Sequence, residues 1–326
     1  KGFDDALDKQ KSNARKNWAG TGSAATEKIW FDVVSRSGIT DFLGYEENNG
    51  KAIIQDIIVI DKSVKNITKD IEAVLILNQT PFYAESGGQI GDTGSISFNE
   101  SVFEVTDTKK KLGLHLHYGK LKNGNLKIGD DVLLSIDSNR RDSLRSYHSA
   151  THLLHQSLRD TLGDHVSQKG SLVSFDRLRF DFSHHKQISD DEIKTIESNV
   201  EKIISLSYPV TTQSMKPEDA IKKGALALFG EKYGDEVRVL SIGAENDKAY
   251  SVELCGGTHV KNTNEIGKFK IISSTSVAAG VRRIEALRNN DVDTFIASQA
   301  AKDKEQDDIL KKKETDAKKK LSAIGE

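Results

Sequence analysis

The stretch SLRSYHSATHLLHQSLRDT, residues 143–161, separates two kinds of sequence pattern, and we predict that it forms a helix. Before it, short runs rich in Ile, Val and Leu are separated by Gly, Asn and Lys. After it, strand-like runs alternate with helical ones. The chain is therefore expected to contain a small β domain followed by an α+β domain, and its fold class is predicted as α+β.

The part before this helix predicts a small antiparallel β-barrel preceded by helices. Two helices are predicted within the first 50 residues, one carrying Phe3 to Trp18 and one over 24–35. Asn123-Gly124 predicts a hairpin turn between Leu121 and Leu126. The predicted strands cover residues 52–60, 72–77, 94–98, 102–107, 112–118 and 131–136.

The part after the helix predicts a mixed domain and a helical tail. Ser189-Asp-Asp-Glu192 has the spacing of a capping box and predicts a helix to about residue 206. A short helix is expected near 217–227, and a long one begins near 291, with apolar residues too sparse for a coiled coil. The predicted strands cover 170–173, 178–182, 237–242, 250–254, 268–274 and 281–286.

Composition excludes several classes of protein. Lys and Arg number 47 and Asp and Glu 49, so a histone-like polycation is excluded, although a local basic groove is not. A single cysteine, Cys255, excludes an intrachain disulfide framework. No apolar run is long enough for a transmembrane helix, and no signal-peptide pattern is present. Because the chain starts with Lys and ends in a Lys-rich helical pattern, we expect an internal piece of a longer protein.

Two histidine-containing motifs predict a metal site. His148 and His152 are four residues apart on the predicted helix, so both rings lie on one face. Cys255 and His259 have the same spacing around two glycines, in a tight loop that follows a predicted strand. Three imidazoles and one thiolate form a suitable tetrahedral set for Zn²⁺. The alternatives are two partly buried histidines bonded to backbone, and an inert buried thiol.

Other polar segments have weaker implications. The Gly-rich loop at 79–92 is either a ligand-binding loop or a structural turn between strands. His155 lies three residues after His152 and is a reserve ligand. Strand alternation sends Arg282 and Arg283 to opposite faces, where one could contact a phosphate, although surface ion pairing is the usual role. The lysine run at 109–111 is expected to be a solvated loop.

Taken together, the motifs are very specific, and the chain resembles the central and editing portion of bacterial alanyl-tRNA synthetases over nearly its whole length. The segments that carry the resemblance are QTPFYAESGGQIGDTG (79–94), HSATHLLH (148–155), QKGSLV (168–173), LRFDF (178–182), CGGTHV (255–260) and GVRRIEA (280–286). The resemblance implies four parts: residues 1–50, a helical end of the tRNA-recognition region; 51–145, a β-barrel; 146–290, the editing domain; and 291–326, the start of a long helix.

The resemblance also implies a function. The editing domain of this family hydrolyses the ester of tRNA(Ala) mischarged with serine or glycine. His148, His152, Cys255 and His259 would then hold zinc, and Thr80 and Gln168 would lie near the aminoacyl group, with Thr80 sensing the serine hydroxyl. Four protein ligands close a tetrahedral shell, whereas catalytic zinc usually keeps an open position. Either one ligand is weak or displaced and zinc binds the attacking water, or zinc mainly positions the substrate, which is the interpretation we favour.

Several further expectations follow from the resemblance. The aminoacylation domain would precede residue 1, so this chain is not expected to activate alanine. The protein is expected to be cytoplasmic, without a membrane partner, and a homo-oligomer through a C-terminal region. Two rivals remain, a freestanding trans-editing deacylase and a non-catalytic zinc RNA-binding module. The candidate RNA-binding residues are Arg140, Arg141, Arg145, Arg282 and Arg283, each of which could equally be structural.

Overall fold

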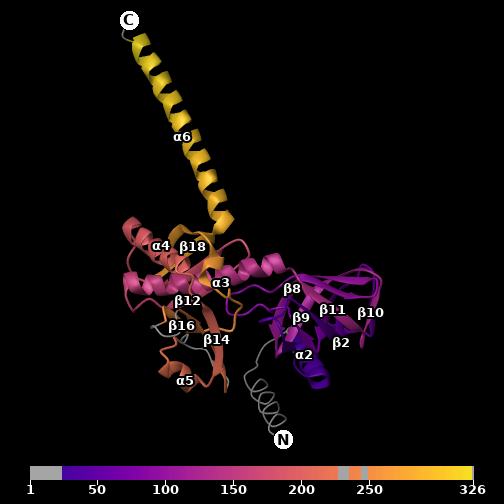
Figure 1. Ribbon diagram of the computed structural model, residues 1–326. Helices are drawn as coiled ribbons and strands as arrows, with labels where there is room; N and C mark the ends of the chain where they lie inside the picture. Colours follow the sequence, from indigo (N-terminus) through magenta and orange to yellow (C-terminus); the bar gives the residue numbers. More distant parts are fainter. Residues whose placement is uncertain (1–23, 227–234, 244–248, 325–326) are drawn as a thin grey trace. The chain divides into compact units, whose positions relative to one another are not determined.

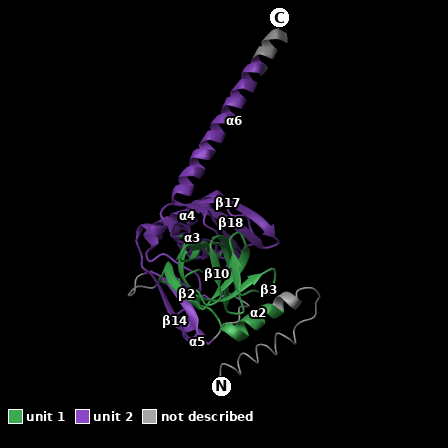
Figure 2. Cartoon of the chain, turned by 90° about the vertical axis from the view of Figure 1, so that its right-hand side faces the viewer, with its two compact units in different colours: residues 1–84, 91–137 green, residues 85–90, 138–326 purple. Residues whose placement is uncertain are grey.

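The computed structural model describes residues 24–226, 235–243 and 249–324. The chain forms two compact units (Figure 2): residues up to Ala84 with Gly91–Asp137, and Glu85–Ile90 with the residues from Ser138 onward. The predicted helix from Phe3 to Trp18 lies outside the described residues. Within those residues, no helix combines the length and apolar character needed to span a membrane.

The first unit contains the predicted antiparallel β-barrel. Six strands follow one another in the order β11-β7-β8-β9-β5-β2, and pairing of β11 with β2 closes the sheet. Closure leaves no free edge among these six strands. Their bounds are β2 (Asn49–Val59), β5 (Glu72–Leu77), β7 (Gly94–Phe98), β8 (Ser101–Lys111), β9 (Leu114–Asn123) and β11 (Asp131–Ile136).

Alternation along the strands produces the barrel interior. In β11, Val132, Leu134 and Ile136 are buried, whereas the residues between them are exposed. Helix α2 (Ala24–Ser37) packs Trp30 and Val33 with apolar residues of β2, β5 and β9 in a separate cluster. Five short strands complete the unit: β1 (Asp41–Phe42), β3 (Lys62–Ser63), β4 (Asn66–Thr68), β6 (Gln79–Thr80) and β10 (Asn125–Lys127).

The predicted hairpin at Asn123-Gly124 is wrong. The chain turns there, with Gly124 at φ +75°, but β10 pairs with β4 and not with β9. Strand β9 already pairs with β8 on one edge and β5 on the other, so neither edge can accept β10. The hairpin of this region joins β8 to β9 at Leu112-Gly113, and both turn residues have positive φ. Consequently the lysine run at 109–111 lies in β8 and not in a loop.

Two buried histidines of β9 are expected to make the first unit sensitive to acid. The ring nitrogens of His117 lie 3.0 Å from the Leu75 carbonyl oxygen and 2.8 Å from Thr80 Oγ1. His115 Nδ1 lies 3.0 Å from the Phe82 carbonyl oxygen. Burial outweighs these hydrogen bonds and lowers the pKa of His117 to about 3 and that of His115 to about 4.

The free energy of unfolding of the first unit is therefore expected to fall as the pH drops below about 6.5. As the pH falls, the two histidines become protonated in the unfolded chain before they do so in the folded one. Each histidine therefore lowers the free energy of unfolding by up to about 1.4 kcal/mol per pH unit, until the pH reaches its pKa in the folded state. Native-state hydrogen exchange of β5 and β9 amides at about pH 7 and pH 5, corrected for the intrinsic exchange rate, measures this slope. His117→Gln should reduce it, and an unchanged slope would contradict the assignment.

The second unit is the expected α+β domain. Helix α3 (Ser138–Leu162) and helix α4 (Asp190–Ser205) pack with a four-stranded antiparallel sheet of order β12-β13-β18-β17. A second sheet has the order β14-β15-β16. The bounds are β12 (Gln168–Val173), β13 (Leu178–Ser183), β14 (Val210–Met215), β15 (Val237–Ile242), β16 (Ser251–Leu254), β17 (Phe269–Ala278) and β18 (Val281–Arg288), with α5 (Pro217–Lys222) and the 3₁₀ turn η1 (Thr263–Ile266).

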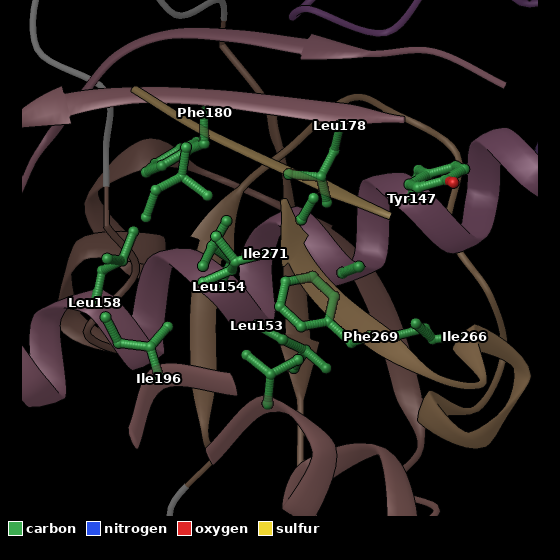
Figure 3. Close-up of a cluster of buried hydrophobic side chains, with 14 of the residues drawn as sticks. Tyr147, Leu153, Leu154, Leu158, Leu178, Phe180, Ile196, Ile266, Phe269 and Ile271 are labelled. Atoms are coloured by element: carbon green, nitrogen blue, oxygen red, sulfur yellow. The ribbon is translucent and has the colours of Figure 1, made fainter. Parts of the chain in front are cut away.

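The core of this unit fixes the position of α3. Leu153, Leu154 and Leu158 of α3 gather with side chains from α4 and from the four-stranded sheet, including Phe180 and Ile271 (Figure 3). The capping box at Ser189 and Glu192 is confirmed, since each side chain bonds to the backbone N–H of the other residue. Strand β14 was not predicted, because its four central residues are polar and exposed.

The chain continues into α6 (Asn289–Ile324), the expected long C-terminal helix, which is one continuous helix in Figure 1. Near its start Val292 is buried. Farther along, Ile296, Ile309 and Leu310 are exposed. The sparse apolar residues in its sequence therefore correspond to a helix that is mostly solvated.

Candidate metal centre

Helix α3 presents two imidazoles on one face. His148 and His152 are both buried, and their rings are stacked with centroids 5.3 Å apart. One helical turn separates residues four apart, so the i, i+4 spacing alone produces this arrangement. The core residues of α3 lock the helix in place and thereby fix the direction of both rings.

The loop after β16 supplies the other two ligands. Cys255 Sγ lies 3.2 Å from His259 Nε2 and 3.5 Å from His148 Nε2. One donor atom from each of His148, His152, Cys255 and His259 lies within 4.8 Å of every other. The two predicted half-sites therefore meet as one cluster. Both cysteine and histidine nitrogen are ligands that Zn²⁺ prefers, and four of them complete a tetrahedral shell.

The backbone of this loop is held close to α3. The Arg238 guanidinium donates to the carbonyl oxygens of Cys255 and Gly257, at 3.2 and 2.7 Å. A β-carbon at Gly257 would lie 2.0 Å from Cε1 of His148. Only glycine permits this approach.

Each histidine of the cluster has a second partner at its Nδ1 atom. Nδ1 of His148 lies 2.8 Å from Gln89 Oε1, that of His152 lies 2.9 Å from Glu253 Oε2, and that of His259 lies 3.2 Å from Ser149 Oγ. Such partners orient the rings of metal-binding histidines.

The buried Nε2 atom of His152 provides the test of fit. It has no hydrogen-bond partner among the described residues, although its other ring nitrogen bonds to a carboxylate. A buried polar atom without a partner is costly, and a metal ion at the centre of the cluster would satisfy it. The donor set and this orphaned atom both fit a zinc ion.

The charges of the cluster also suit a cation. Burial opposes ionisation of Cys255, but His148, His259 and His152 outweigh it and hold the pKa of the thiol well below its usual value. Burial likewise opposes charge on His152, whose pKa is nevertheless raised to about 10 by Glu253 and Cys255. Because a metal binds the neutral ring, a cation at this position competes with a proton on His152.

Two residues beside the cluster, His155 and Glu253, have roles that differ from the sequence prediction or were absent from it. His155, expected as a reserve ligand, instead lies with Nδ1 3.3 Å from both carboxylate oxygens of Glu253 and is outside the four-residue group. Glu253 was not predicted, and strand alternation is the signal that could have found it, since it lies two residues before Cys255 on the same face. Gln89 was predicted only as part of a polar loop.

Thr80 and Gln168, the residues suggested for the aminoacyl group, lie in different units. Thr80 is fully buried in the first unit, where Oγ1 contacts His117 and accepts the backbone N–H of Phe82. Gln168 is the partly buried first residue of β12 in the second unit, and its backbone pairs with Phe182. Their roles stay predictions.

The candidate RNA-binding arginines of α3 differ in burial and in the groups that they contact. Arg141 is fully buried, and Arg145 pairs with Asp142 at 3.0 Å. Arg140 lies over the ring of Phe175.

The two arginines of β18 have different partners. Arg283 makes two hydrogen bonds to Asp181, at 2.7 and 2.8 Å, and Arg282 donates to the His185 carbonyl oxygen. An RNA-binding role for any of the five arginines stays a prediction.

Comparisons with known proteins give the family. Residues 1–140 match the model described as tRNA synthetases class II (A), and residues 237–285 match the one described as threonyl and alanyl tRNA synthetase second additional domain. The alanine–tRNA ligase of Parvibaculum lavamentivorans is 51% identical over 303 residues. This chain belongs to the alanyl-tRNA synthetase family. The match covers 91% of this chain and 34% of the relative.

A second member of the alanyl-tRNA synthetase family gives the same result. The alanine–tRNA ligase of Mesorhizobium japonicum is 52% identical over 292 residues, which are 88% of this chain and 33% of the relative. The chain thus spans about a third of the length of these two relatives. The second domain match contains Cys255 and His259, whereas His148 and His152 lie between the two matched ranges.

Proposed function

We propose that this chain hydrolyses the ester bond of tRNA(Ala) mischarged with serine or glycine. The observation that supports this most strongly is the four-residue cluster of histidines and cysteine in a chain that matches the second additional domain of threonyl and alanyl synthetases. The two relatives are named alanine–tRNA ligases, so tRNA(Ala) is the proposed RNA partner. We also propose that the whole protein, in the cytoplasm, attaches alanine to tRNA(Ala) using ATP.

Hydrolytic editing is needed because a pocket for alanine discriminates poorly. Glycine is smaller than alanine and enters any alanine site, and serine differs by one hydroxyl. Differences of this size are worth only about 1–3 kcal/mol in an apolar pocket. A second site that hydrogen-bonds the serine hydroxyl rejects alanine more strongly, because its own polar groups would be left unpaired.

Within this proposal each residue of the cluster has a defined task. His148, His152 and His259 would bind zinc through Nε2, and Cys255 would bind it as a thiolate. Zinc supplies positive charge that orients the substrate or lowers the pKa of a water molecule. Glu253 holds the His152 ring, and Thr80 is proposed to recognise the serine hydroxyl. His117 donates its Nδ1–H to the Leu75 carbonyl oxygen, so its Nε2 atom is an acceptor and receives a hydrogen bond from the Thr80 hydroxyl. The Thr80 hydroxyl hydrogen is therefore already used, and a serine hydroxyl would have to donate to the Thr80 oxygen.

A non-catalytic zinc module that binds RNA is the second candidate. The presence of four protein ligands favours it, because structural zinc sites have closed tetrahedral shells whereas catalytic sites keep an open position. Substitutions that leave zinc bound separate the two candidates. If the chain is an enzyme, Thr80→Val and Gln168→Ala should impair hydrolysis while zinc stays bound. If it is a non-catalytic RNA-binding module, neither the original chain nor any variant should hydrolyse the ester.

The direct test is deacylation of Ser-tRNA(Ala), Gly-tRNA(Ala) and Ala-tRNA(Ala) by the zinc-loaded and the metal-stripped chain. We expect loss of serine and glycine, little loss of alanine, and a return to the uncatalysed rate when zinc is removed. Thr80→Val should slow serine release and spare glycine, which has no hydroxyl to recognise. Stoichiometric zinc binding with no hydrolysis of any of the three substrates would contradict the enzymatic function.

A further inference from the structure

A short loop from an early part of the sequence belongs to the second unit. Residues 85–90 are grouped with α3 and the four-stranded sheet. The Gly88 carbonyl oxygen accepts the N–H of Val173 at 2.7 Å, and the N–H of Ile90 donates to the Val173 carbonyl oxygen at 3.2 Å. These bonds attach the loop to β12. Gly88 has φ +84°, and a β-carbon there would lie 2.7 Å from the Ser171 carbonyl oxygen.

This attachment places the Gln89 side chain in the interior, where it is fully buried. Its amide oxygen lies 3.0 Å from the Thr258 backbone N–H and 2.8 Å from His148 Nδ1. Its amide nitrogen donates to Thr258 Oγ1 at 2.9 Å. One side chain therefore bonds to residues from both half-sites of the cluster.

The chemistry of these partners fixes the proton positions. A backbone N–H can only donate, so the atom of Gln89 that faces the Thr258 N–H is the oxygen. An amide oxygen can only accept, so His148 Nδ1 must carry its proton. In a neutral ring the lone pair is then on Nε2, the atom that lies 3.5 Å from Cys255 Sγ.

We infer that Gln89 is a positioning residue of the metal centre, which selects the Nε2-binding form of His148 and ties that ring to the loop carrying Cys255 and His259. The inference rests on the proposed zinc centre. The loop at 79–92 is therefore more than a turn between strands, because its residue Gln89 contacts the cluster directly. Without the amide oxygen, His148 could place its proton on Nε2 and lose its capacity to bind.

The test compares three substitutions in the full chain. Gln89→Met keeps the length and the apolar stem but removes the acceptor, whereas Gln89→Glu keeps acceptor oxygens, as Glu253 does for His152. The matched control is Gln187→Met, the same change at an exposed position. Zinc affinity is measured by competition with a chelator, and the cobalt-loaded protein reports ligand geometry through its absorption spectrum. Circular dichroism checks that each variant is folded.

We expect Gln89→Met to weaken zinc binding by about 10–100-fold and to change the cobalt spectrum, as loss of such partners does in other metal sites. Gln89→Glu should retain affinity close to the original, and Gln187→Met should be unchanged. Equal affinity of the original and the Gln89→Met chains, or equal losses in Gln89→Met and Gln89→Glu, would overturn the inference. Failure of the unsubstituted chain to bind zinc would instead overturn the proposed metal centre, and the inference with it.

Discussion

Replacing Cys255 with alanine is expected to abolish stoichiometric zinc binding and, with it, hydrolysis of Ser-tRNA(Ala). Cys255 contributes the one anionic ligand among the four, and its thiol has a pKa held low by the three neighbouring histidines. Losing a ligand should cost more than the roughly 100-fold that marks the upper end for losing a ligand's hydrogen-bond partner. Chelator competition and metal analysis of the purified variant measure the loss.

The control for this substitution is His185→Ala. His185 lies in the same unit, is exposed, and is outside the four-residue cluster. That variant should bind one zinc ion with unchanged affinity. If Cys255→Ala bound zinc as tightly as the original chain, the thiol would not be a ligand, and the inert buried cysteine would be the correct interpretation.

Replacing Gly257 with alanine is expected to disrupt the centre without removing any ligand. The added β-carbon would lie 2.0 Å from Cε1 and 2.3 Å from Nδ1 of His148. Either the His148 ring must leave its bond to Gln89, or the loop with Cys255 and His259 must move away. We expect zinc binding to weaken by about 10–100-fold. We also expect deacylation to fall on the order of 100-fold, as small displacements in a catalytic site can produce.

The neighbouring glycine provides a matched control. A β-carbon at Gly256 would have no atom within 4 Å outside its chain neighbours. Gly256→Ala should therefore change stability by less than about 0.5 kcal/mol and leave zinc affinity as it is. Equal zinc affinity in the Gly256→Ala and Gly257→Ala variants would show that the loop does not approach His148 in solution as closely as described.

Much of the local structure was predictable from the sequence because short-range geometry has a fixed period. The i, i+4 spacing places His148 and His152 on one face of α3 in any helix. The capping box at Ser189 and Glu192 uses only neighbouring atoms. Strand β15 has the predicted bounds because its apolar residues mark it clearly, whereas β14 carries no such mark and was missed.

The errors arose where several pairings were locally equivalent. Asn123-Gly124 suits a hairpin turn, but β10 found its partner in β4, because both edges of β9 were occupied. A turn sequence does not encode which edges remain free. That depends on the closure of the barrel, in which β11 pairs with β2 from the other end of the unit.

The sequence by itself therefore determined most of the longer helices and strands of this protein, although not β14, and it determined the identity of the four candidate ligands, because residue type and spacing act within one or two turns of chain. Only the tertiary structure decided what surrounds them. His148 meets Cys255 across 107 residues and Gln89 across 59. No local period links such distant positions. They come together because α3 shares one core with both sheets of the second unit, and the loop with Gln89 is attached to β12 of one sheet whereas the loop with Cys255 follows β16 of the other.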